Sequence, residues 1–448
     1  MSRNQGTDGQ RQAQRVVAPG LPSGGEWLVA MATSLAVAAV FTWPLLGRFC
    51  EAIPAGGEAE TVALLNLTVV EHLGRVLAGD AAFWDLAIFA PHTGTLAWSE
   101  TQPLAGLLHA ALSALGLPTA AAYNVLVLLW LASGGLATWL TARLLTPDRL
   151  AAAAAAAWIA GGAFVAQRVA ALHLVALGFP LLAVWAVLAL GRGFDRRLLW
   201  LAAAMVVATW LSCGQYLVLL AAVLPAVAAI TLRWRRLRWP QWAEMAAALA
   251  LVAAAVLPLA WAQRQHLTAM GFSRPPASAL GVRHAAALLQ PPVGHWLWPP
   301  DAPALQFGDS TASWDLGVVL LAVLALALLA SRLRPGLLFD ANRRVAAALL
   351  VLGLLALGLA FAPHARVAGL TLWPWLSALV PGLDQLRSPG RLVFFASFAI
   401  AALAAPALAW LRLKWPRARN LTLIVVVLLL GAEMWVMPAA MADLGEGV

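Results

Sequence analysis

Long apolar runs recur along this chain, separated by short polar connections, and they limit the folds open to it more than any other feature. About 20 apolar residues in a helix cross the ~30 Å hydrocarbon core of a bilayer. Inside that core every backbone N–H and C=O group must find its partner within the protein, which favours helices. Only 11% of the residues are charged, against roughly a quarter in soluble domains. We therefore expect an all-α, polytopic transmembrane helical bundle.

The basic residues fall in short clusters at every second connection between apolar runs, a pattern typical of cytoplasmic loops. We read the net charge of +9 in this way, so a lipid bilayer is the expected partner and nucleic acid is not. The clusters are Arg143 and Arg149; Arg192, Arg196 and Arg197; Arg233, Arg235, Arg236 and Arg238; Arg332, Arg334, Arg343 and Arg344; and Arg412, Lys414, Arg417 and Arg419. With all of them on one side, the pattern predicts about eleven spans, at 27–49, 121–143, 150–166, 173–191, 198–212, 215–232, 241–262, 314–331, 345–361, 391–411 and 420–437.

The same pattern divides the chain into a disordered cytoplasmic tail (1–26) and a single transmembrane domain (27–448). It places the N-terminus in the cytoplasm and the C-terminus in the periplasm, and the expected location is the bacterial inner (cytoplasmic) membrane. Periplasmic loops are predicted at 47–120, 263–313 and 362–390. The first of these loops is long, and we expect it to carry interfacial helices. Residues 61–77 are amphipathic, and residues 103–117 are apolar but short for a span.

The first loop also carries the strongest candidates for chemistry. Glu58 and Glu60 follow Gly56 and Gly57, and glycine lets the backbone turn tightly towards a ligand. On an irregular segment both carboxylates can face one divalent cation, such as Mg²⁺ or Mn²⁺, that completes its shell with water and phosphate. Either carboxylate can instead act as a general base towards a hydroxyl group. The alternative interpretation is a solvated acidic loop.

Glu100 lies just before segment 103–117, at a depth where an unpaired carboxylate is costly. It can pair with Arg168 or His173, which lie at the ends of adjoining predicted spans. Together with Ser99 it can instead cap the helix that follows.

Three arginines lie at the ends of predicted spans on the loop side. Arg168, Arg387 and Arg391 can each hold the phosphate of a lipid-linked substrate, because the guanidinium group matches phosphate in charge and geometry. The alternative is that these side chains only extend to the membrane interface, with their aliphatic stems buried.

Several short motifs recur in the predicted periplasmic loops and at the span ends. They are Gly57-Glu58-Ala59-Glu60; Trp84-Asp85-Leu86-Ala87-Ile88-Phe89-Ala90-Pro91; Thr95-Leu96-Ala97-Trp98-Ser99-Glu100; Ala122-Tyr123-Asn124; the region from Arg168 to His173; Gln215-Tyr216; and Val380-Pro381-Gly382-Leu383-Asp384-Gln385-Leu386-Arg387-Ser388-Pro389-Gly390-Arg391. Together they resemble the GT-C superfamily of integral membrane glycosyltransferases, specifically its bacterial polytopic members. The resemblance covers most of the chain.

This resemblance implies that an acidic residue of the first loop, Glu58 or Glu60, acts as catalytic base or metal ligand. It also implies a polyprenyl-phosphate-linked sugar as donor and inversion at the anomeric centre. Position 58 departs from the usual Asp of the superfamily, and its side chain is one methylene longer. The substrate-binding residues are then expected to be Glu100, Arg168, His173, Gln215, Tyr216, Arg387 and Arg391.

The sequence thus favours a membrane glycosyltransferase that moves a sugar from a polyprenyl-phosphate donor to an acceptor at the outer face of the inner membrane. A transporter or flippase of lipid-linked sugars is one alternative, and a degenerate member that serves only as a scaffold is another. The chain contains no Walker A loop, no H-E-x-x-H and no G-x-S-x-G motif. Their absence argues against P-loop NTPases, zinc metalloproteases of that class and α/β-hydrolases.

Overall fold

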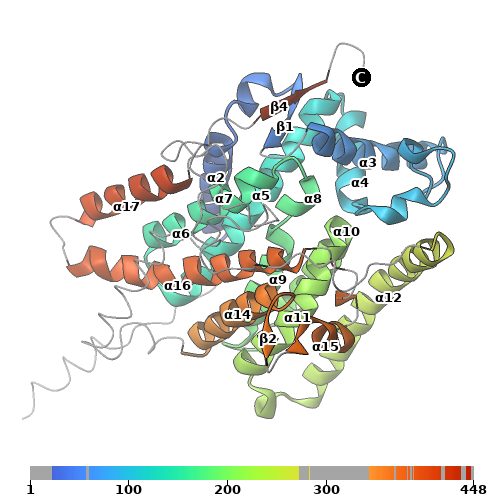
Figure 1. Cartoon of the computed structure of the whole chain (residues 1–448). Helices are drawn as coiled ribbons and strands as arrows, with labels where there is room; N and C mark the ends of the chain where they lie inside the picture. Colours follow the sequence, from blue (N-terminus) through green and yellow to red (C-terminus); the bar gives the residue numbers. More distant parts are fainter. Residues whose placement is uncertain are drawn as a thin grey trace, which may run out of the picture.

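The computed structural model of the chain describes residues 23–56, 60–271, 282, 343–367, 370–380, 382–383, 386, 388–414, 419–434 and 440–444. Within these ranges the chain forms a bundle of apolar helices with two small antiparallel β-ladders (Figure 1). The longer helices are α2 (Gly24–Phe41), α3 (Glu60–Ala78), α4 (Pro103–Ala114), α5 (Thr119–Leu145), α6 (Arg149–Gly161), α9 (Gly178–Leu190), α10 (Arg196–Ser212), α11 (Gly214–Thr231), α12 (Trp239–Ala269), α14 (Arg343–Phe361), α16 (Val393–Lys414) and α17 (Arg419–Met434). The short elements are η1 (Leu45–Arg48), η2 (Ala87–Phe89), η3 (Thr95–Trp98), α7 (Ala163–Arg168), α8 (Leu172–Val175), η4 (Trp234–Arg236), α15 (Trp373–Leu379), η8 (Pro389–Leu392) and strands β1 (Ala52–Gly56), β2 (Arg366–Val367), β3 (Leu370–Thr371) and β4 (Ala440–Asp443).

Among the described residues, 9 helical segments are long and apolar enough to cross a membrane, which confirms an all-α, multi-pass transmembrane bundle. They include α3, which the sequence placed on the membrane surface. The α10 and α17 helices, at 17 and 16 residues, are slightly shorter than these segments. The α4 helix has 12 residues, about 18 Å at 1.5 Å per residue, and is too short to span. The predicted span 314–331 lies outside the described residues.

The α5 helix lies at the centre of the bundle and packs against α2, α6, α9 and α16. Small residues allow this close packing. A Cβ atom at Gly135 would lie 2.6 Å from the Ser34 hydroxyl on α2 and 3.1 Å from Ala160 Cβ on α6. Close approach of backbones through glycine and alanine is how helices associate in membranes, where apolar burial alone gives no advantage over lipid.

The first predicted span, 27–49, is shorter in the structure, because α2 ends at Phe41. Thr42 and Trp43 then lead into Pro44. Proline lacks the N–H group that a helix requires and disfavours helical conformation in the residue before it.

The predicted spans 150–166 and 173–191 are interrupted by breaks that the sequence analysis did not foresee. The α6 helix ends at Gly161, and the short helices α7 and α8 precede α9. At Gly162 a Cβ atom would lie 2.4 Å from the carbonyl oxygen of Trp158, so the chain can turn there only with glycine. Arg168 and His173 therefore lie on an irregular segment between two long helices, which we call the broken segment (residues 162–177).

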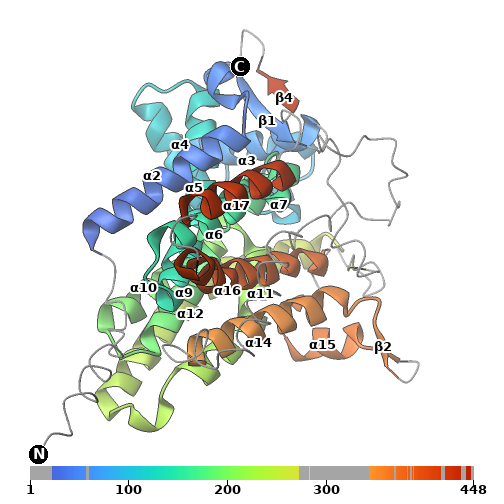
Figure 2. The same cartoon turned by 90° about the vertical axis from the view of Figure 1, so that its left-hand side faces the viewer.

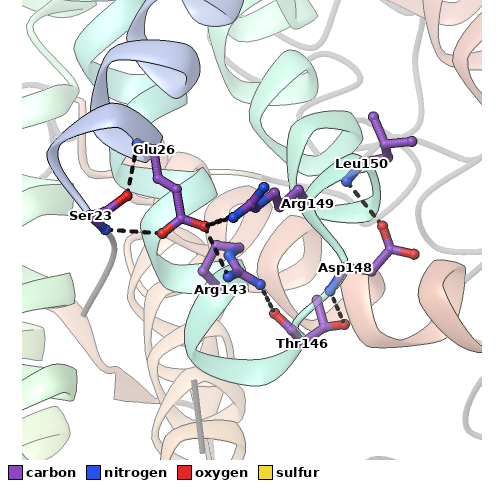
Figure 3. Close-up of polar contacts among 7 residues, drawn as sticks. All are labelled: Ser23, Glu26, Arg143, Thr146, Asp148, Arg149 and Leu150. Atoms are coloured by element: carbon purple, nitrogen blue, oxygen red, sulfur yellow. Dashed lines mark hydrogen bonds and ion pairs between the residues drawn. The ribbon is translucent and has the colours of Figure 1, made fainter. Parts of the chain in front are cut away.

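One end of the bundle is rich in arginine, and Figure 3 shows how Glu26 pairs there with Arg143 and Arg149. Glu26, at the start of α2, accepts hydrogen bonds from Arg149 Nε at 2.8 Å and Arg143 Nη2 at 3.5 Å. Asp148 caps α6 by accepting from the backbone N–H of Leu150 at 3.0 Å, and it also pairs with Arg412 of α16. These contacts join the ends of α2, α5, α6 and α16.

Two more arginine contacts belong to this arginine-rich end. Arg192 donates to the carbonyl oxygen of Leu144, and Arg196 Nε lies 3.4 Å from Glu244 Oε1 near the start of α12. Arginines of three of the predicted basic clusters therefore lie at the same end of the bundle. Which side of the membrane this end faces stays a prediction.

The opposite end holds the first loop and the two strands β1 and β4 (Figure 2). The β4 strand pairs antiparallel with β1, with Ile53 opposite Ala442. Arg48 pairs with Asp443, and the Asn124 side chain donates to the carbonyl oxygens of Phe49 and Ala52, both at 2.8 Å. The chain after α17 thus returns to hold the strand that leads into the predicted acidic segment.

We expect Asp148→Ala to destabilise the bundle by about 4–6 kcal/mol. It removes a helix cap, worth about 1 kcal/mol. It also leaves Arg412, whose side chain is 11% exposed, without its carboxylate, and breaking a buried pair costs about 3–5 kcal/mol. Thermal unfolding of the purified chain in detergent measures the effect.

Asp195→Ala is the matched control, because Asp195 caps α10 by accepting from the N–H of Arg197 and makes no ion pair in the described part of the chain. It should cost about 1 kcal/mol. Equal losses in the two variants would contradict a structural role for the pair with Arg412.

Candidate functional site

The first loop after α3 is folded by contacts among its own motif residues. The Asp85 carboxylate accepts from the backbone N–H of Gly94 at 2.7 Å, and the Thr95 hydroxyl donates to the carbonyl oxygen of Leu86 at 2.9 Å. Gly94 has a φ of +72°, which glycine adopts without strain. These contacts join the Trp84–Pro91 and Thr95–Glu100 motifs, so Asp85 has a structural role in the loop.

The α12 helix holds the same loop from the other side. Gln263 Nε2 donates to the carbonyl oxygens of Ala97 at 3.2 Å and Ser99 at 3.4 Å. The ring of His266 contacts that of Trp84 in a tilted arrangement, with centroids 4.8 Å apart. The helix extends to Ala269, seven residues beyond the predicted end of its span at 262. This extension fixes the backbone next to Glu100.

Glu100 caps the start of α11, a role that the sequence analysis did not foresee. Its carboxylate accepts from the backbone N–H groups of Gly214 at 2.6 Å and Gln215 at 3.2 Å. The first N–H groups of a helix have no partner within it, and the helix dipole favours a negative charge there. The prediction that Glu100 pairs with Arg168 or His173, or caps the following helix, is therefore wrong: α4 has Gln102 at its N-cap position.

The side chain of Gln215 also contacts Arg391. Arg391 Nη1 donates to Gln215 Oε1 at 2.6 Å. The Nε atom of Arg391 is buried and has no hydrogen-bond partner within the described ranges. Arg391 therefore contacts a neutral amide here, and part of its hydrogen-bonding capacity remains unused.

His173 is held by a second hydrogen-bonded group. Its Nδ1 atom lies 2.9 Å from Asn66 Oδ1, and Gln102 Nε2 donates to the same oxygen at 3.0 Å. Asn66 and Gln102 are buried, with 4% and 2% of their surface exposed. This group joins α3, the turn before α4 and the broken segment.

The two groups lie side by side because one tyrosine bridges their elements. The Tyr216 hydroxyl donates to the carbonyl oxygen of Leu174 at 2.6 Å, next to Gln215 in one element and His173 in the other. Glu100 and Gln102 are also separated by a single residue. We call the six residues Asn66, Glu100, Gln102, His173, Gln215 and Arg391 the polar cluster.

Arg168 is buried in an aromatic environment. Its Nη1 atom donates to the carbonyl oxygen of Phe164 at 3.1 Å, and the guanidinium lies 4.0 Å from the centroid of the Phe164 ring. Phe164 contacts Phe394, which also contacts Tyr216 with ring centroids 5.0 Å apart. Arg168 and Tyr216 thus border the polar cluster through aromatic packing.

The predicted acidic pair is described only in part. Glu60 is exposed and begins α3, six residues before Asn66, which is about 9 Å along the helix axis. Glu58 and Arg387 lie outside the described residues. Within the described ranges, no three His, Cys, Asp or Glu side chains come together as a metal-binding group, and the expected Mg²⁺ or Mn²⁺ ion stays a prediction.

Asn66 and Gln102 were not among the predicted site residues, because their neutral amides carry no charge signal. A signal was present in the sequence. Asn66 interrupts an apolar helical stretch, and Gln102 directly precedes Pro103. Buried polar side chains are almost always hydrogen-bonded, so neutral amides in apolar segments also indicate polar contacts.

The chain matches a protein-family model. The family model described as "Domain of unknown function (DUF6311)" matches residues 83–432. This range includes five of the six residues of the polar cluster and the broken segment, and it begins after Glu60 and Asn66. No curated protein matches the chain.

We expect ionisation of Glu100 to destabilise the fold. Desolvation raises the pKa of this half-buried carboxyl group above its ordinary value of 4.5 and outweighs the opposing hydrogen bonds from Gly214 and Gln215. Because the folded state holds the proton to higher pH than the unfolded state, stability falls as the pH rises through the raised pKa. Glu100→Gln keeps an acceptor oxygen and removes the charge, so its unfolding midpoint should exceed that of the wild type at pH 8.

The difference between the two midpoints should shrink as the pH falls towards 4.5, the ordinary pKa of glutamate. Thermal unfolding in detergent at a series of pH values measures it. The control is Glu51→Gln, which removes an exposed carboxylate and changes the net charge equally. A midpoint difference for Glu100→Gln that is independent of pH would contradict the prediction.

Proposed function

We propose that this chain, which belongs to the DUF6311 family and folds as a multi-pass helical membrane protein, is a membrane glycosyltransferase of GT-C type. The enzyme moves a sugar from a polyprenyl-phosphate donor to an acceptor at the outer face of the bacterial inner membrane. The arginine-rich end then faces the cytoplasm, and the polar cluster faces the periplasm.

The observation that carries this proposal is the position of Arg391. It lies at the end of an apolar bundle, contacts the neutral side chain of Gln215, and keeps a buried Nε donor without a partner in the described part of the chain. A guanidinium in this state can bind the phosphate of a lipid carrier with a charge-assisted hydrogen bond. The apolar helices beside it offer a surface for the prenyl chain.

The transfer step requires positioning, a base and stabilisation of the leaving phosphate. The acceptor hydroxyl oxygen forms a bond to the anomeric carbon, and the bond from that carbon to the phosphate oxygen breaks. The hydroxyl proton passes to the carboxylate of Glu60 or Glu58, and the departing phosphate keeps the electron pair beside Arg391. Attack opposite the leaving group inverts the anomeric centre. A divalent ion held by these carboxylates would supply further charge neutralisation.

A flippase of lipid-linked sugars is the second candidate, and the broken segment favours it. Interrupted helices near a binding site are typical of transporters, where they expose backbone groups to the substrate. A flippase moves the lipid-linked sugar without breaking the bond between sugar and phosphate. The experiments below therefore follow bond cleavage and translocation separately.

We expect the double variant Glu58→Gln and Glu60→Gln to lower sugar transfer by roughly 100-fold or more, the contribution of a general base. Membranes containing the full chain are supplied with radiolabelled polyprenyl-phosphate sugars, and release of the label from the lipid is measured. Glu51→Gln, in the same loop, is the control. Transfer that is unchanged in the double variant would overturn the assignment of base. Translocation of intact donor in vesicles, with no label released, would favour the flippase.

We expect Arg391→Gln to raise the KM for the lipid-linked donor by roughly 30-fold, because a charge-assisted hydrogen bond contributes about 1.5–3 kcal/mol. The KM for the acceptor should change little. Arg197→Gln is the matched control, since Arg197 is exposed at the arginine-rich end. An increase in donor KM that is equal in the two variants would show only a general effect of charge.

A further inference from the structure

The strongest unassigned feature of the molecule is the way two neutral amides hold His173. We propose that Asn66 and Gln102 are positioning residues that fix the neutral His173 imidazole with its proton on Nδ1. Its Nε2 atom then accepts a hydrogen bond from a hydroxyl group of the substrate. The hydroxyl-binding role rests on the proposed function, whereas the protonation pattern does not.

The orientation of the Asn66 amide follows from its neighbours. Its Nδ2 atom donates to the carbonyl oxygen of Val62 at 2.8 Å, and a carbonyl oxygen can only accept. The reversed amide would place two oxygens against each other. Oδ1 therefore faces His173 and Gln102, and it can only accept from them. The imidazole must then carry a proton on Nδ1, which in the neutral ring leaves a lone pair on Nε2.

Gln102 shows that this arrangement is maintained at a cost. It has a φ of +47°, a left-handed conformation that a residue with a side chain seldom adopts. Its Oε1 atom is buried without a hydrogen-bond partner among the described residues. Strain and an unsatisfied polar group at one residue are typical of positions kept for function. Here both accompany the Nε2 donor that fixes the Asn66 oxygen.

Two other histidines of the chain provide an internal comparison. His72 Nε2 lies 3.1 Å from the carbonyl oxygen of Phe83, and His109 Nε2 lies 3.3 Å from that of Thr119. Because these carbonyls can only accept, both imidazoles carry the proton on Nε2. His173 is thus expected to be the opposite tautomer of both.

The location of His173 suits a hydroxyl-bearing ligand. The His173 side chain is partly exposed. The next residue, Leu174, accepts a hydrogen bond from Tyr216. Tyr216 directly follows Gln215, which contacts Arg391. A ligand whose phosphate contacts Arg391 would bring neighbouring hydroxyl groups towards the same end of the broken segment. A lone pair on Nε2 selects a hydrogen-bond donor, and sugars offer several.

The direct test is ¹⁵N NMR of the full chain in bilayers, labelled at histidine, at pH 8. Unprotonated and protonated ring nitrogens have well separated resonances, and His173→Gln identifies the His173 signals by their loss. The expected result is a protonated Nδ1 and an unprotonated Nε2 for His173, with the opposite pattern for His72 and His109. A wild-type His173 protonated on Nε2 would overturn the proposal, whether or not the protein transfers sugars.

Asn66→Leu and Asn66→Asp test the positioning role. Leucine removes the acceptor, so the proton should redistribute towards Nε2. Aspartate keeps an acceptor and adds charge, so both ring nitrogens should be protonated over a wider pH range. If the leucine variant fails to fold, the aspartate variant still decides. An unchanged tautomer in the leucine variant would overturn the role of Asn66, and so would an unchanged pH range of the doubly protonated ring in the aspartate variant.

The functional arm measures acceptor and donor KM separately. We expect Asn66→Leu to raise the acceptor KM by roughly 10-fold, the value of one hydrogen bond, with the donor KM little changed. Gln241→Leu is the control, because Gln241 accepts a hydrogen bond from the backbone N–H of Arg238 at the start of α12 and does not contact this group. Equal effects of both variants would contradict hydroxyl binding by His173. A chain with the expected tautomer but no transfer would refute the proposed function alone.

Discussion

Backbone polar groups inside an apolar bundle must be satisfied by the protein itself, and the broken segment depends on this constraint. The chain has only two tyrosines, and both donate hydrogen bonds to backbone carbonyl oxygens of the broken segment. Tyr123 donates to the carbonyl oxygen of Ala170 at 3.4 Å, and Tyr216 donates to that of Leu174 at 2.6 Å. Arg168 likewise donates to the carbonyl oxygen of Phe164. Irregular backbone can therefore persist between long helices, and it places His173 within reach of α3.

The same constraint also links the first loop to the bundle, through Glu100. The N–H groups at the start of α11 would otherwise remain unsatisfied, and the carboxylate supplies their acceptor from a loop more than a hundred residues earlier. Gln263 satisfies carbonyls on the same stretch of loop. The loop is thereby joined to two helices, and its fold is coupled to the position of Gln215. A loop held in this way can present Gln102 to Asn66 with a defined geometry.

The helices and the polar end could be predicted from the sequence, and the particular contacts could not. Span length and arginine clusters depend on local composition, so the bundle and the common end of Arg143, Arg192 and Arg412 were foreseen. The breaks around Gly162 were hidden in a continuous apolar run. The partner of Glu100 depends on tertiary packing, since no spacing rule connects it with Gly214. Asn66 and Gln102 were missed because neutral amides give no charge signal.

The two ends of the bundle differ in whether their arginines are paired with carboxylates, and this difference bears on function. At the arginine-rich end, Glu26 and Asp148 neutralise Arg143, Arg149 and Arg412 in part. In the polar cluster the carboxylate of Glu100 accepts from backbone N–H groups instead, and among the described residues Arg391 donates to the amide oxygen of Gln215. A direct pair between these two residues would have cancelled the cation. The charge of Arg391 favours the ionised form of Glu100, but the guanidinium makes no ion pair with that carboxylate within the described ranges. Part of its hydrogen-bonding capacity is therefore open to an anionic ligand such as the proposed lipid-linked phosphate.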